Sequence, residues 1–158
     1  MNSDKGVGER VSTPPRRLWR STGAVLLGFF AVVVLSLGTD QVLHVMEVYP
    51  PWGQPMHEPG LNLLALAYRS VYTVAGGYLA AKLAPHAPMR HVLVLGIIGL
   101  VMGTVGAIAT IPMDLGPAWY PIALAATGLP FTWLGGVLHR MRRVERRATG
   151  SLRKMQSS

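Results

Sequence analysis

The sequence predicts an all-α integral membrane protein, a bundle of four transmembrane helices arranged as two helical hairpins. Composition is the first indication, because hydrophobic residues make up 50% of the 158 residues and charged residues only 14%. The second is that four long segments carry almost no charge, and each is close to the roughly 20 residues that cross a hydrocarbon core of about 30 Å. These segments are residues 21–39, 61–81, 92–113 and 115–138.

The residues around these segments carry the signals that end a helix. Residues 1–20 are polar and rich in proline and glycine, which predicts a disordered basic tail. Pro50, Pro85 and Pro112 are expected to end the first, second and third helices, and Pro130 is expected to kink the fourth. The predicted transmembrane domain is 21–139, with helices at about 21–46, 61–83, 92–111 and 119–139, followed by a second basic tail at 140–158.

Lysine and arginine are distributed unevenly outside the predicted helices. Five lie in residues 1–20, two in the loop between the second and third helices, and seven after residue 139. The loops 47–60 and 112–118 contain none. Since an excess of these residues marks the cytoplasmic side of a membrane, we expect both termini in the cytoplasm and the chain in the cell (plasma) membrane.

A weak internal repeat accompanies the two hairpins. A shift of 68 positions aligns Gly28 and Gly38 of the first helix with Gly96 and Gly106 of the third. Because each half would cross the membrane twice, the repeat would be parallel rather than inverted.

Four glycines are expected to form one stripe on the third helix. Their spacing of 3, 4 and 3 residues places them on the same side of a helix, and small residues let two helices approach closely in lipid. The stripe predicts helix packing within the chain, with a homo-oligomer as the alternative. Its members are Gly96, Gly99, Gly103 and Gly106.

The outer end of the first helix is unusually polar. Asp40, His44 and Glu47 are 4 and 3 residues apart and should share one helix face. Three interpretations remain open: a partly solvated helix end, a proton relay, or a divalent-cation site completed by His57 and Glu58. The spacing does not match a metal-binding motif, so no metal is assigned.

Arg69 is the most informative residue of the second helix. A charge within the bilayer is costly and normally faces the protein interior with a partner, and Tyr72 and Gly76 should share its face. Asp40 lies about 9 Å from the end of its helix and Arg69 about 12 Å from the start of its own, at about 1.5 Å per residue. We therefore predict an ion pair between Asp40 and Arg69.

The remaining features favour a membrane function over an enzymatic one. The basic tails should attract anionic lipid headgroups of the bilayer, whereas a nucleic-acid partner is not expected because the positive charges flank apolar helices. The chain has no cysteine, and no recognisable nucleophile–base pair or cofactor motif was found. We expect a non-catalytic structural or accessory membrane subunit. The alternative is an oligomeric transporter or channel component with a polar site near Asp40, His44 and Arg69.

Overall fold

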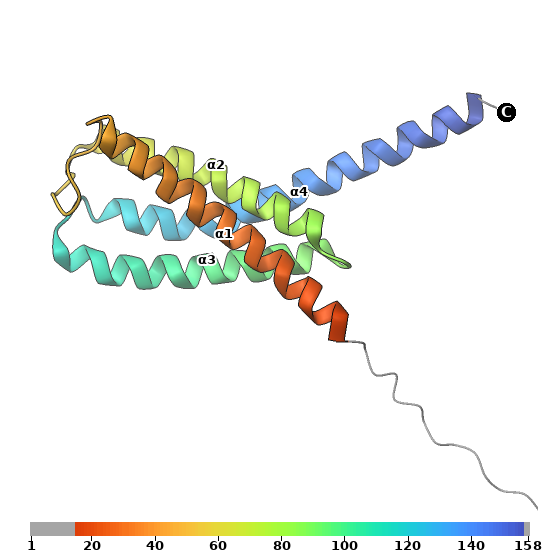
Figure 1. Ribbon diagram of the computed structural model, residues 1–158, viewed down its shortest axis with the longest axis horizontal. Helices are drawn as coiled ribbons and strands as arrows, with labels where there is room; N and C mark the ends of the chain where they lie inside the picture. The colour runs from red at the N-terminus through yellow and green to blue at the C-terminus, as the bar shows by residue number, and fades with distance from the viewer. Residues whose placement is uncertain (1–14, 157–158) are drawn as a thin grey trace, which may run out of the picture.

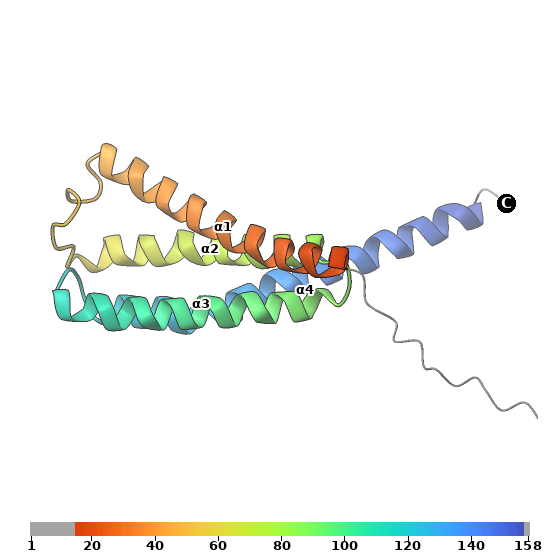
Figure 2. The same ribbon diagram turned by 60° about the horizontal axis from the view of Figure 1, so that its bottom comes forward.

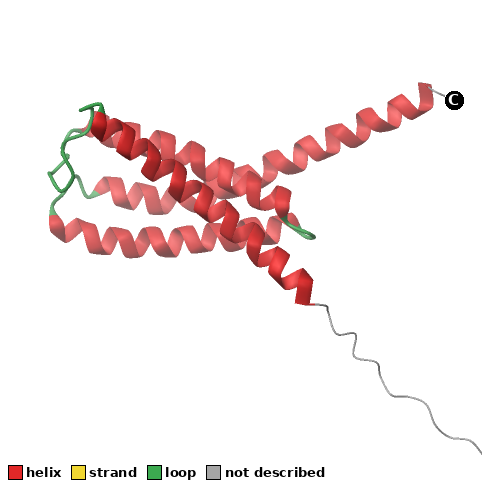
Figure 3. Ribbon diagram, viewed as in Figure 1, coloured by secondary structure: helices red, strands yellow, loops and turns green. Residues whose placement is uncertain are grey.

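The computed structural model describes residues 15–156, and this part of the chain is helical except for its connecting turns and loops (Figures 1 and 3). The described residues contain four α-helices and one short 3-10 helix. Their bounds are α1 Pro15–Val45, α2 Pro59–Leu83, α3 Pro88–Thr110, η1 Ile111–Met113 and α4 Trp119–Gln156.

The helices are not equally embedded in the bundle. The most extensive contacts join α4 to α2 and to α3, while α1 packs mainly on α2 and more lightly on α3. Figure 2 shows α1 close to the other helices at the end where it begins and separating from α2 toward the loop that joins the two. The fold is therefore a group of three closely packed helices, α2, α3 and α4, with α1 packed at an angle against α2.

Helix α1 differs from the sequence expectation at both ends. It begins at Pro15 rather than near residue 21, which proline permits because the first turn of a helix needs no backbone donor. Residues 1–14 of the predicted tail lie outside the described residues. At the other end Glu47 has a left-handed φ of 58°, and the amides of Val48 and Tyr49 both donate to the Leu43 carbonyl. This turn stops the helix at Val45.

Helix α4 is longer than the sequence analysis expected. It continues to Gln156 instead of ending near residue 139, and its last part projects beyond the bundle (Figure 1). Residues 140–156 contain no proline and are rich in arginine and other good helix formers, so nothing in their composition stops the helix. Pro130 lies within α4 without ending it.

Close approach of α2 and α4 depends on glycine. A Cβ atom on Gly77 would overlap the backbone carbonyl of Thr132, and one on Gly135 would overlap the carbonyl of Val74. Because both obstacles are backbone atoms, neither can move aside without shifting a helix. The two helices thus meet at a distance that only glycine allows.

The predicted glycine stripe of α3 divides into two rows. Gly96 and Gly103 face α4, where their Cβ positions are 3.4 Å from Leu129 Cγ and 3.0 Å from Ala125 Cα. A Cβ on Gly99 or Gly106 would meet nothing within 4 Å in the described part of the chain. The two rows therefore differ in the room for a side chain: it is tight at Gly96 and Gly103 and open at Gly99 and Gly106, although the Gly99 backbone still lies beside Gly128 of α4.

Bulky apolar residues lie on the outside of the bundle and small residues within it. Val34 is 65% exposed and Ile108 70% exposed, whereas Ala65 and Ala80 are buried. Among the described residues, three segments are long and apolar enough to cross a membrane: Trp19–Val45, Pro88–Met113 and Trp119–Arg146. Such an apolar exterior would be unfavourable in water and is typical of contact with lipid.

Candidate functional site

The polar centre of the molecule is the carboxylate of Asp40. Asp40 of α1 is only 5% exposed, and the two oxygens of its side chain accept hydrogen bonds from different donors of α2. The Nη2 atom of Arg69 donates to Oδ2 at 2.5 Å, and the hydroxyl of Tyr68 donates to Oδ1. Two neighbouring residues of α2 thus donate hydrogen bonds to one carboxylate of α1.

A second contact between α1 and α2 lies beside these hydrogen bonds. The hydroxyls of Thr39 on α1 and Tyr72 on α2 are 2.8 Å apart and share a hydrogen bond. The structure therefore brings three of the predicted site residues, Asp40, Arg69 and Tyr72, to the contact between α1 and α2. We refer to Thr39, Asp40, Tyr68, Arg69 and Tyr72 as the outer polar cluster.

Sequence reasoning missed Tyr68, because it lies about 100° around the helix from Arg69. Both residues can still bind Asp40, because Tyr68 donates to one oxygen of its carboxylate and Arg69 to the other. Helix α1 therefore lies between the faces of α2 that carry these two side chains. The four-residue spacing of Tyr68 and Tyr72 beside Arg69 was the signal that could have identified this tyrosine.

His44 lies apart from the carboxylate in an aromatic setting. Its ring centroid is 4.0 Å from that of Trp52 and 5.6 Å from that of Tyr49, and its Nδ1 atom is buried without a hydrogen-bond partner. Tyr49 is buried, and its hydroxyl donates to the Leu61 carbonyl at 3.4 Å. Burial raises the pKa of the Tyr49 phenol, so this group stays a protonated donor at neutral pH. These contacts hold the loop against the ends of α1 and α2.

The remaining predicted residues do not join the outer polar cluster. Glu47 lies beyond the left-handed turn that ends α1, so it does not continue the helix face of Asp40 and His44, and its side chain is exposed. His57 and Glu58 are also exposed. Within residues 15–156, no three histidine, aspartate or glutamate side chains are grouped as a metal site.

Arg69 also borders two cavities: the first is lined by residues of all four α-helices, and the second by residues of α2, α3, α4 and the loops beside them. The first has a volume of about 360 Å³ and the second about 390 Å³, and the guanidinium Nε is buried without a hydrogen-bond partner. Both cavities are mostly apolar, and sites of about this size hold small ligands in other proteins. The residues that line both are Arg69, Met102, Gly103 and Leu124.

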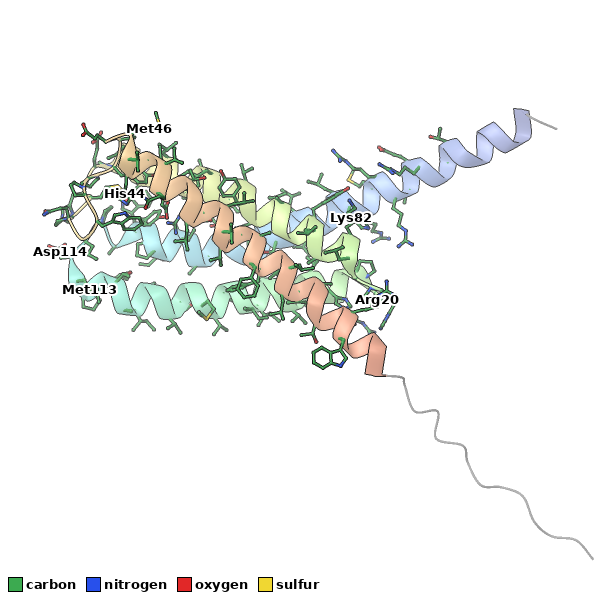
Figure 4. The ribbon with its side chains drawn as sticks, in the orientation of Figure 1. Arg20, His44, Met46, Lys82, Met113 and Asp114 are labelled. Atoms are coloured by element: carbon green, nitrogen blue, oxygen red, sulfur yellow. The ribbon has the colours of Figure 1, made fainter. Side chains whose placement is uncertain are left out.

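The two ends of the bundle differ in charge. Figure 4 shows Arg20 and Lys82 at one end, and His44, Met46, Met113 and Asp114 at the other. The outer polar cluster belongs to the half that contains His44, because Asp40 precedes His44 by one turn of α1. Arg20 and Lys82, two of the basic residues expected on the cytoplasmic side, thus lie at the same end of the bundle.

Comparison of the chain with known protein families, curated proteins and solved structures finds no match. The interpretation of the site rests on its own geometry. That geometry offers a carboxylate with both oxygens hydrogen-bonded and a guanidinium whose Nε is buried without a hydrogen-bond partner. The first can join helices, and the second can receive an acceptor from the cavities.

Proposed function

We propose that the chain is a multi-pass protein of the cell membrane that serves as a structural or accessory subunit. The observation that supports this function best is the pairing of Asp40 with two donors of α2. A carboxylate whose two oxygens are both engaged inside the chain is not free for a substrate. Its charge instead offsets the cost of burying Arg69 and joins α1 to α2.

The proposal includes α2 as a fourth transmembrane helix. Its polar side chains lower its hydropathy, yet Tyr68 and Arg69 point to Asp40 rather than to the surroundings. The exposed side chains of α2 include Leu63 and Val71, which are apolar. A helix with its charge inside and apolar residues outside can cross a bilayer beside three apolar neighbours.

The proposed orientation has both termini in the cytoplasm, and introduced cysteines can test it because the chain has none of its own. Gln54 and His86 are exposed in loops at opposite ends of the bundle. A membrane-impermeant maleimide should label Gln54→Cys on intact cells, and should label His86→Cys only after permeabilisation. The reverse pattern would show that the orientation is inverted.

A component of a transporter or channel is the second candidate. It is supported by the two cavities, which meet at Arg69 and would place a guanidinium beside a passing solute. Four helices are few for an alternating-access machine, so this function would also require a homo-oligomer. The cavities would then have to contain water.

Labelling of Gly99→Cys separates the two candidates. Gly99 lines the first cavity, and a Cβ atom there meets nothing within 4 Å, so cysteine should fit. A structural subunit predicts that a charged methanethiosulfonate reacts with Gly99→Cys at least about 100-fold more slowly than with Gln54→Cys. Gly38→Cys is the matched control, because Gly38 is an exposed glycine of α1 that should face lipid. Reaction of Gly99→Cys at the rate of Gln54→Cys, with Gly38→Cys unreactive, would favour transport.

A further inference from the structure

A basic hollow lies where α4 leaves the bundle. It has a volume of about 530 Å³ and is formed by the end of α2, the turn at residues 84–87 and one face of α4. On α4 its members are spaced 3, 1 and 3 residues apart, so they share a face. Its titratable basic side chains are Lys82, His86, His139, Arg142, Arg143 and Arg146.

Within this hollow, two side chains of α4 contact an aromatic ring of α2. The guanidinium of Arg142 lies 5.7 Å from the ring centroid of Tyr78, and the His139 ring meets the same ring edge-on at 5.4 Å. One aromatic side chain of α2 therefore orients two basic residues of α4. The arrangement is more specific than a charged tail, because a ring and a turn fix where these residues lie.

The positive charges of the hollow are not neutralised within the described part of the chain. No aspartate or glutamate lines it, and the salt bridge found among the described residues, between Asp40 and Arg69, lies elsewhere. Lys82 and three arginines line the same hollow and therefore repel one another unless an anion lies between them. Guanidinium groups match the oxygens of a phosphate by two parallel hydrogen bonds, so phosphate is the anion that this set fits best.

We propose that this hollow binds a phosphate group, carried either by the headgroup of an anionic phospholipid or by a soluble phosphate. Its position supports a lipid source, because Leu83, Leu138 and Met141 beside it are apolar and exposed. Acyl chains could contact these residues while the headgroup occupies the hollow. The sequence predicted headgroup attraction along the entire basic tail, whereas the structure concentrates it at one site.

Thermal unfolding of the purified full chain in a neutral detergent tests the proposal. The probes are dioctanoyl phosphatidylglycerol, dioctanoyl phosphatidylcholine and inorganic phosphate, each titrated to give an apparent Kd. We expect Arg142→Gln/Arg146→Gln to weaken phosphatidylglycerol binding roughly tenfold or more. The matched control is Arg20→Gln/Arg90→Gln, which removes the same charge from residues that do not line the hollow, and its Kd should stay within about twofold of the wild type.

Each arm of the experiment has a defined meaning. Protection by phosphatidylglycerol alone identifies a lipid headgroup, while equal protection by inorganic phosphate identifies a soluble source. Equal weakening of phosphatidylglycerol binding in Arg142→Gln/Arg146→Gln and in the control would overturn the proposal, because surface charge alone would then explain the binding. Unchanged binding in Arg142→Gln/Arg146→Gln would also overturn it, because these arginines would then not contact the phosphate. Since Arg142 also contacts Tyr78, Lys82→Gln/Arg146→Gln provides a second variant that leaves this contact intact.

Discussion

The two halves of the contact between α1 and α2 are built from different residues. In the half near the start of α1, Gly28 lies against α2 so closely that a Cβ atom there would be 2.8 Å from the Gly76 carbonyl oxygen. In the other half, long polar side chains of the outer polar cluster join the same two helices. One half relies on backbone packing, and the other on hydrogen bonds and charge.

The difference follows from the angle between the helices. Figure 2 shows α1 near the other helices at the end where it begins and farther from α2 toward the loop that joins them. Small residues can fill only the narrow part, whereas tyrosine and arginine span the wider part. In lipid, where apolar association has little driving force, both halves need such specific contacts. The comparison predicts that small changes of volume matter at Gly28, and that changes of polarity matter at the cluster.

The largest effect expected from a change of volume is that of Gly28→Ala. The added Cβ would meet the Gly76 carbonyl oxygen at 2.8 Å and Ala80 Cβ at 3.0 Å, so α1 must shift. We expect a loss of about 2 kcal/mol in the free energy of unfolding, measured in detergent. Gly38→Ala on the same helix is the control. Because its Cβ meets nothing within 4 Å, it should be neutral or slightly stabilising, and equal losses in both variants would refute the glycine contact.

A smaller effect is expected when the cluster loses one hydroxyl. Tyr68→Phe removes a hydrogen bond to the Asp40 carboxylate and should cost about 1.5 kcal/mol of unfolding free energy. Tyr72→Phe removes only a bond between two neutral hydroxyls and should cost about 0.6 kcal/mol. The ratio of the two losses is the informative quantity. If Tyr72→Phe is the more damaging variant, the carboxylate is not the centre of the cluster.

Much of the helical architecture could be predicted from charge-free segments and prolines. Pro59 and Pro88 stand at the first positions of α2 and α3, within a few residues of the expected starts. The two outer boundaries could not be predicted in this way. The residues before Ser21 and after His139 are basic, and charge shows where a bilayer ends rather than where a helix ends.

The ion pair of the polar site could be predicted, because it follows from the charges of the residues and their depth along the helices. Counting residues from the helix ends placed Asp40 and Arg69 at a similar level, and the structure has them in contact. The inclusion of Glu47 failed because it assumed a continuous helix, whereas a left-handed residue ends α1 before it. The spacing placed Gly99 and Gly103 on one stripe, but the room for a Cβ at each depends on the position of α4, which spacing does not give.

The central claim, that Asp40 and Arg69 serve mainly to join α1 to α2, is tested most directly by a double-mutant cycle. Asp40→Asn and Arg69→Gln should each lower the free energy of unfolding by about 3 kcal/mol, because each leaves a charge between α1 and α2 without its partner. The double variant should recover part of this loss, with a coupling energy of about 1 kcal/mol or more. Losses that simply add, with a coupling energy near zero, would contradict the claim.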